Sequence, residues 1–211
     1  MRLTTPARTV IDCFREERFP DGLAIADGAV RQGLVTVTEL VEMRHHERRW
    51  PGVAKAARGI PVIDGRRESW LESYSAGVFV QRKIPVGVPQ VIVLDWAGEF
   101  VARVDAAWPE RGMVGEADGR GKYLGEFADG FGREPEDVAR RVIAAAQRET
   151  RLRDLGLQVV RWDTAEIVSS PDRVVRRWQH AEWAADPGRV RAQFVCVCHR
   201  TALTDCPQST S

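Results

Sequence analysis

The chain has 211 residues, of which 44% are hydrophobic and 29% charged, a balance typical of a folded protein and not of a disordered one. Its 31 basic and 30 acidic residues give a formal net charge of +1, so binding to nucleic acid would require locally clustered charge. No apolar run is long enough to span a membrane, and no signal-peptide core follows Met1. We therefore expect a cytoplasmic protein without a membrane partner.

The first 64 residues predict a small helical segment. Thr5 and Pro6 combine a capping hydroxyl with a proline at the first helical position. Thr36 and Glu39 have the spacing of a capping box, which predicts another helix start. Two more helices are expected over residues 20–32 and 52–58.

A second unit is predicted over residues 65–185, and it begins with a helix. Ser69 and Glu72 have the spacing of a capping box, so Glu72 is explained as a helix cap. The alternative is that Glu72 points over a sheet and joins an acidic site with Asp105. Residues 90–96 follow as an apolar, β-branched strand that is typical of a buried position.

Residues 100–118 predict an antiparallel hairpin that gathers three carboxylates. If the hairpin closes symmetrically about its turn, Asp105 lies opposite Glu116, and Asp118 shares their face. Like charges so close repel, and a bound Mg²⁺ would remove the conflict. The sharper interpretation is a metal site for hydrolysing phosphodiesters, with Lys122 nearby. The alternative is a solvated acidic face on an edge hairpin.

A long helix is predicted from Pro135 to its stop at Gly156, followed by a strand over residues 158–162 and a helix from Pro171. The resulting order is α-βββ-α-β-α. Arginines line this long helix and suit a polyanion such as DNA; the candidates for contacting it are Arg140, Arg148 and Arg151. The alternative is ordinary pairing along the helix surface, as between Glu149 and Arg153.

Residues 186–211 are expected to form a disordered tail that contains three of the four cysteines. Cys196, Cys198 and Cys206, with His199, offer soft ligands for zinc. One residue separates the first two cysteines, whereas zinc-binding cysteine pairs usually have two to four residues between them. Incidental thiols on a frayed tail are therefore the alternative to a zinc site.

Three runs of sequence carry a resemblance to a known family: RRESWLES at residues 66–73, ARVDAAWPERGMVGEADGRGKY at residues 102–123, and RETRLRDLGLQVVRW at residues 148–162. Together they resemble a family common in actinobacteria and related to the very-short-patch-repair endonucleases of the PD-(D/E)XK nuclease superfamily. Upstream, LTTPARTVIDC at residues 3–13 resembles the segment that, in longer relatives, joins an AbiEi-type antitoxin winged helix to this domain. The chain is expected to be a shortened relative, or one with a late start codon.

The resemblance implies an α/β fold with a restriction-endonuclease-like α-βββ-α-β core and a metal site on its second and third strands. Asp105 and Glu116 would be the metal ligands, and Glu72 the supporting helix acid. The superfamily pattern places a lysine two residues after the second acid, where this chain has Asp118. Lys122 would then have to act in its place.

The expected function is therefore a DNA endonuclease that uses Mg²⁺ or Mn²⁺. The alternative is a catalytically inactive, nuclease-like DNA-binding protein that acts as an antitoxin-type transcriptional regulator of a toxin–antitoxin system. The oligomeric state does not follow from the sequence.

Overall fold

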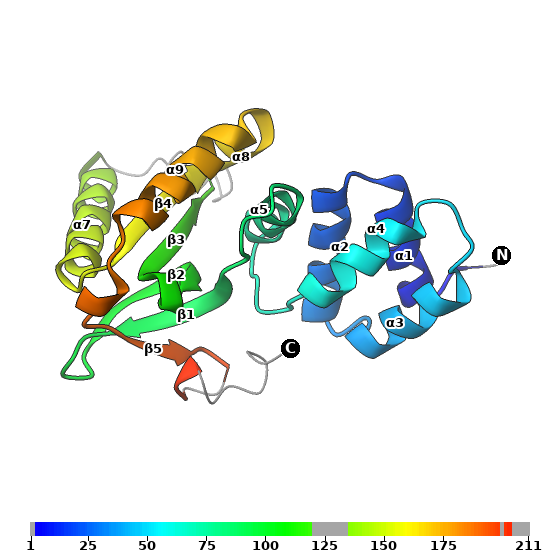
Figure 1. Cartoon of the computed structure of the whole chain (residues 1–211), viewed down its shortest axis with the longest axis horizontal. Helices are drawn as coiled ribbons and strands as arrows, with labels where there is room; N and C mark the ends of the chain where they lie inside the picture. The colour runs from blue at the N-terminus through cyan, green and yellow to red at the C-terminus, as the bar shows by residue number, and fades with distance from the viewer. Residues whose placement is uncertain (1–2, 120–134, 199–200, 204–211) are drawn as a thin grey trace. The chain divides into compact units, whose positions relative to one another are not determined.

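The structure is a computed structural model that describes residues 3–119, 135–198 and 201–203. The chain divides into two compact units (Figure 1). We call residues Met1–Val86 the helical unit and residues Gly87–Thr210 the sheet unit, and each is described by itself.

The helical unit contains the helices predicted for its N-terminal part. Its elements are α1 (Pro6–Glu16), α2 (Phe19–Arg31), α3 (Val37–His46), α4 (Val53–Gly59), a 3₁₀ turn (Ile60–Val62) and α5 (Trp70–Gln81). The Thr5 side chain accepts a hydrogen bond from the Arg8 backbone N–H, as expected of an N-cap. The capping box of Thr36 and Glu39 is present at the start of α3.

Helix α5 packs within the helical unit, against α2. Gly77 of α5 makes this close approach possible, because a Cβ at this position would lie 2.5 Å from the Pro20 Cα of α2. The packing therefore divides the chain after Val86, whereas the sequence predicted a boundary between residues 64 and 65. Glu72 lies on α5, and so in the helical unit rather than with the strands.

The sheet unit is an α/β structure built on one five-stranded mixed sheet in the order β4-β3-β2-β1-β5. Its elements are β1 (Val88–Leu94), β2 (Phe100–Trp108), a 3₁₀ turn (Pro109–Arg111), β3 (Met113–Asp118), α7 (Pro135–Asp154), β4 (Gln158–Asp163), α8 (Thr164–Ser169), α9 (Pro171–Ala184), a 3₁₀ turn (Pro187–Arg189) and β5 (Gln193–Cys196). Neighbouring strands are antiparallel except β3 and β4, which are parallel. The order of these helices and strands along the chain agrees with the predicted order. The structure contains two further elements that were not predicted, α8 and β5.

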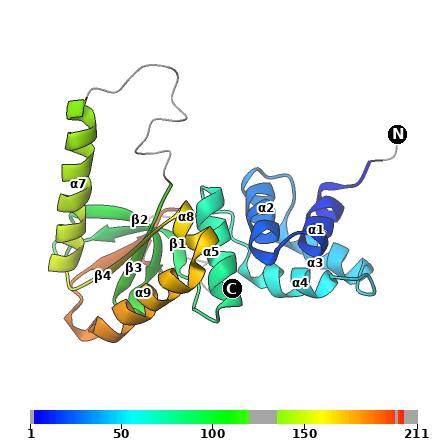
Figure 2. The same ribbon diagram turned by 90° about the horizontal axis from the view of Figure 1, so that it is seen from above.

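Helices α7 and α9 cover opposite faces of this sheet (Figure 2). Glu116 of β3 contacts Arg148 of α7, so its side chain lies on the α7 face. The adjacent Gly115 is on the other face, where a Cβ would lie 2.8 Å from the Trp162 ring and 3.0 Å from the Trp108 ring. Trp108 in turn packs edge to face on Trp178 of α9, with ring centroids 5.8 Å apart.

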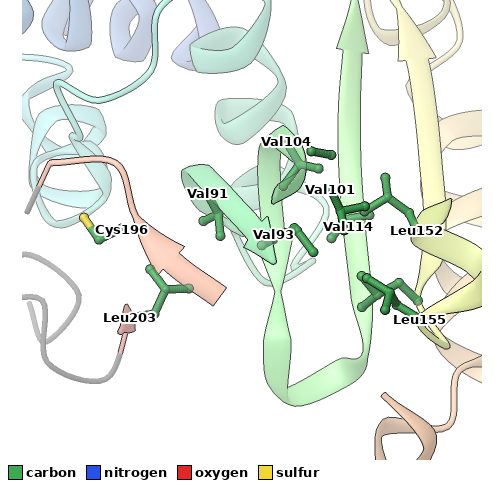
Figure 3. Packing of buried hydrophobic residues seen from close by; sticks show 12 residues of the cluster. Val91, Val93, Val101, Val104, Val114, Leu152, Leu155, Cys196 and Leu203 are labelled. Atoms are coloured by element: carbon green, nitrogen blue, oxygen red, sulfur yellow. The ribbon is translucent and has the colours of Figure 1, made fainter. Parts of the chain in front are cut away.

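The apolar core of the sheet unit joins the central strands to the end of α7 (Figure 3). Its fully buried members include Val91, Val93 and Val114 from the strands and Leu152 from α7. The burial of Val91 and Val93 agrees with the buried strand predicted over residues 90–96. The core thus fixes the C-terminal turns of α7 over the sheet, and Arg148 of α7 pairs with Glu116 of the hairpin.

Part of the predicted tail is ordered strand. Residues Gln193–Cys196 form β5, which pairs with Leu94–Val91 of β1 at one edge of the sheet. Cys196 and Cys198 are joined by a disulfide, so these two thiols are not zinc ligands here. His199 and Cys206 lie outside the described residues.

Among the helices that the structure describes, we find none with the length and apolar character needed to cross a lipid bilayer.

Candidate active site

Four polar residues occupy aligned positions on the four strands from β1 to β4. The β1–β2 ladder pairs Pro89 with Ala106 and Val91 with Val104, which leaves Gln90 facing Asp105. The β2–β3 ladder ends at Ala106 and Gly115, and one further step aligns Asp105 with Glu116. Glu116 is paired with Arg161 of β4. We call Gln90, Asp105, Glu116 and Arg161 the polar row.

The hairpin register matches the symmetrical closure predicted from the sequence. Trp108 pairs with Met113 and Ala107 with Val114, on either side of the Pro109–Arg111 turn. The slipped register that would have separated Asp105 from Glu116 does not occur. As far as the Ala106–Gly115 pair, the register is therefore the one predicted from the sequence.

Glu116 is almost completely buried, with 3% of its surface exposed. Its Oε2 accepts hydrogen bonds from Arg148 Nη2 at 2.9 Å and from Arg161 Nη2 at 2.5 Å. Its Oε1 is buried and has no hydrogen-bond partner. A buried carboxylate oxygen without a donor is costly, so this oxygen is a place where a water or a cation would be favourably bound.

Arg161 links Glu116 to the other acids of this region. Its Nε lies 3.2 Å from Glu149 Oε2, and its Nη1 lies 3.9 Å from Asp118 Oδ2. Glu149 also pairs with Arg153 at 2.7 Å, as predicted for helix-surface pairing. Asp118 is thus linked to Glu116 through Arg161, by the longest of these ion pairs.

Asp105 is held by the neighbouring strand. Its Oδ2 accepts a hydrogen bond of 2.8 Å from the Ala117 backbone N–H, one residue beyond Glu116. The bond fixes the carboxylate at the point where the β2–β3 ladder opens.

Glu72 and Lys122 are the two remaining residues that the sequence predicted for the site. Glu72 caps its own helix: its carboxylate accepts from the Glu68 backbone N–H at 3.0 Å and from the Ser69 hydroxyl at 2.8 Å. These hydrogen bonds agree with the interpretation of Glu72 as a helix cap. Lys122 lies outside the described residues.

The predicted DNA-contacting arginines of α7 differ from one another. Arg148 binds Glu116 and keeps 41% of its side chain exposed. Arg151 is exposed and donates a hydrogen bond of 3.0 Å to the Phe100 carbonyl. Arg140 is also exposed. Arg148 therefore joins Glu116 to the surface.

Two carboxylates of the polar row, those of Asp105 and Glu116, are the candidates for holding a cation with few protein ligands. Among the side chains that the structure describes, no group of three or more from His, Cys, Asp and Glu could hold a metal ion. Mg²⁺ is commonly bound through only one or two carboxylates and keeps several waters. Asp105 and the unpartnered Oε1 of Glu116 are suited to that arrangement.

Three residues of this region were missed by sequence reasoning: Gln90, Glu149 as a partner of β4, and Arg161. Gln90 is buried and has a positive φ of 54°, which is unusual for a residue other than glycine. The positions of Glu149 and Arg161 depend on the parallel β3–β4 register. The basic residue within QVVRW was a visible signal for Arg161, because charged residues are uncommon in buried parallel strands.

Two relatives are uncharacterised proteins of Mycobacterium tuberculosis, MT2308 of strain CDC 1551 / Oshkosh and Rv2248 of strain H37Rv. Each is 27% identical to this chain over 174 residues, which cover 82% of the chain and 59% of the relative. The chain thus matches little more than half the length of these relatives. No family model matches the chain. No solved structure matches it either.

Proposed function

We propose that the sheet unit is a restriction-endonuclease-like domain of the PD-(D/E)XK type that hydrolyses phosphodiester bonds of DNA with Mg²⁺ or Mn²⁺. The observation that carries this proposal is the buried, unpartnered Oε1 of Glu116, which is aligned with Asp105 in the polar row. A purely structural carboxylate would be expected to use both oxygens.

The topology supports the proposed fold. Strands β1, β2 and β3 form a meander, α7 follows, and β4 returns parallel to β3. This is the βββ-α-β part of the core implied by the resemblance. The two acids lie on the second and third strands, where the resemblance expects metal ligands.

Asp105 and Glu116 would hold the cation, which when bound lowers the pKa of a coordinated water and neutralises charge on the phosphate. Arg148 would bind the scissile phosphate, because its half-exposed guanidinium already lies at the edge of the acidic residues. Arg161, on the neighbouring strand β4, would hold the Glu116 carboxylate in position through its hydrogen bond to Oε2. The water oxygen would bond to phosphorus while the bond from phosphorus to the sugar oxygen breaks. The proton that the water loses would end on that sugar oxygen, and the product would be a nicked strand.

The test is cleavage of a supercoiled plasmid with Mg²⁺ or Mn²⁺. Asp105→Asn keeps an oxygen that accepts from the Ala117 N–H but removes the charge. We expect a loss of roughly 100-fold or more, since losing a group that only orients a metal ligand already costs about 10- to 100-fold. The matched control is Glu110→Gln, an exposed acid in the turn of the same hairpin, which should cleave like the wild type. Cleavage by Asp105→Asn at the wild-type rate would refute the proposal.

One observation favours a second candidate, an antitoxin-type transcriptional regulator related to the AbiEi proteins that binds DNA without cutting it. Two guanidinium groups already neutralise Oε2 of Glu116, and Asp118 stands where the superfamily has a lysine. Because two arginines already neutralise the charge of Glu116, the domain would keep its fold without a bound metal. Retarded migration of DNA in EDTA, together with an intact plasmid in Mg²⁺ and in Mn²⁺, would favour this regulator over the nuclease.

A further inference from the structure

Gln90 has an unusual backbone conformation for its place in the sheet. Its φ is 54°, although it lies inside β1 with strand pairs on both sides. The register with β2 is the same before and after Gln90, so no inserted residue forces this conformation. A side chain disfavours the left-handed region because its Cβ approaches the following carbonyl oxygen.

Lys83 is the other non-glycine residue with a positive φ in the described part of the chain, at 58°. It follows α5, is exposed, and its N–H bonds the Val80 carbonyl, a common arrangement at helix ends. Gln90 has no such explanation, since it lies within a strand and is only 4% exposed. Strained residues of this kind concentrate at functional sites.

The place of Gln90 in the sheet suggests what it does. It faces Asp105 across the β1–β2 pair, a position from which cross-strand side chains interact. A buried amide requires hydrogen-bond partners, and its NH₂ group donates to carboxylates. Asp105 already accepts from Ala117 on the β3 side, so Gln90 is the facing group on the β1 side.

We propose that Gln90 is a positioning residue of the site, whose side-chain amide donates to the Asp105 carboxylate and holds it in place for the cation. The inference rests on the proposed metal site but not on DNA cleavage. It accounts for both oddities of Gln90: the strain is retained because it keeps a polar amide beside Asp105 inside the sheet.

The experiment measures Mn²⁺ affinity by calorimetry, plasmid cleavage and thermal unfolding on the full chain. Gln90→Met keeps the length of the side chain and the strain but removes the amide. Gln90→Gly removes the strain and the amide together. Gln81→Met makes the same chemical change at an exposed position at the end of α5 and is the matched control.

We expect Gln90→Met and Gln90→Gly to bind Mn²⁺ about 10-fold more weakly than the wild type, as is typical when a group that orients a metal ligand is lost. Cleavage should fall in kcat by a similar factor. Gln90→Gly should unfold at a temperature no lower than Gln90→Met does, because glycine tolerates the positive φ. Gln81→Met should match the wild type in all three measurements.

Wild-type Mn²⁺ affinity in both Gln90 variants would overturn the inference, because a residue that serves only the fold would leave the affinity unchanged. A wild type that binds Mn²⁺ without cutting DNA, with binding weakened in Gln90→Met, would support the role of Gln90 while refuting the nuclease. A wild type that neither binds Mn²⁺ nor cuts DNA would overturn both.

Discussion

Asp27 of the helical unit and Glu116 of the sheet unit are buried carboxylates that arginine neutralises in different ways. In the helical unit, Asp27 is fully buried, and its Oδ2 pairs with Arg67 Nη1 at 2.8 Å. Its Oδ1 accepts from the Asp64 backbone N–H at 2.8 Å. Both oxygens therefore have donors, and the pair fastens α2 to the segment before α5.

In the sheet unit, Glu116 receives two arginines on one oxygen and none on the other. One of these arginines, Arg148, is 41% exposed, whereas Arg67 is 5% exposed. The comparison teaches that charge balance alone does not identify a structural ion pair. A complete set of donors characterises the Asp27 pair, and an unfilled oxygen beside an accessible cation characterises Glu116.

The largest effect is expected from breaking the complete pair. Arg67→Met leaves Asp27 buried without its cation and should lower the free energy of unfolding by about 3–5 kcal/mol. Urea unfolding measures the change, and hydrogen exchange in α2 and α5 assigns it to the helical unit. The double variant Asp27→Leu with Arg67→Met is the control and should recover most of the loss. A cost below about 1 kcal/mol for Arg67→Met would contradict the structural role of the pair.

A smaller effect is expected when Glu116 loses one of its two arginines. Arg161→Met should cost about 1–2 kcal/mol, because Arg148 remains on the same oxygen. Hydrogen exchange in β3 and β4 reports the local change. Arg153→Met, which removes an exposed partner of Glu149, is the matched control and should stay near wild type. If Arg161→Met were as damaging as Arg67→Met, the distinction between the two carboxylates would fail.

The smallest effect is expected in how the free energy of unfolding depends on pH through the titration of Asp27. Burial raises the pKa of Asp27 above its ordinary value, although Arg67 opposes the rise. The folded state therefore binds a proton at pH values where the unfolded state does not, and the contribution of Asp27 to stability increases as the pH falls through the raised pKa. Below the unfolded pKa of about 4 it changes no further. The difference in unfolding free energy between the wild type and Asp27→Asn, followed from pH 7 to pH 4, should shift in favour of the wild type; a constant difference would contradict this.

The sequence was most informative where local rules determine the structure. The hairpin register was predictable from alternation and from a turn centred on Glu110 and Arg111. The caps at Thr5 and Thr36 follow from their side-chain chemistry within one helical turn. None of these features depends on distant parts of the chain.

Features that depend on distant contacts were not predictable. The pairing of Glu116 with Arg161 requires the parallel register of two strands separated by a long connection. Helix α5 was assigned to the strands because its packing on Pro20 is a tertiary contact. The left-handed conformation of Gln90 leaves no trace in a strand of ordinary composition. The parts of the site that involve the first and fourth strands were therefore revealed only by the structure.

The position of β5 has a consequence for how the chain folds. Val91 and Val93 of β1 pair on one side with β2, which follows closely, but on the other side with Val195 and its neighbours, about a hundred residues later. During synthesis the outer edge of β1 stays unpaired until β5 has left the ribosome. Contacts between residues so far apart in sequence also form slowly. An apolar strand with an open edge is a template for pairing with other chains. The interval between making β1 and making β5 is thus the period in which this protein is most exposed to misassembly.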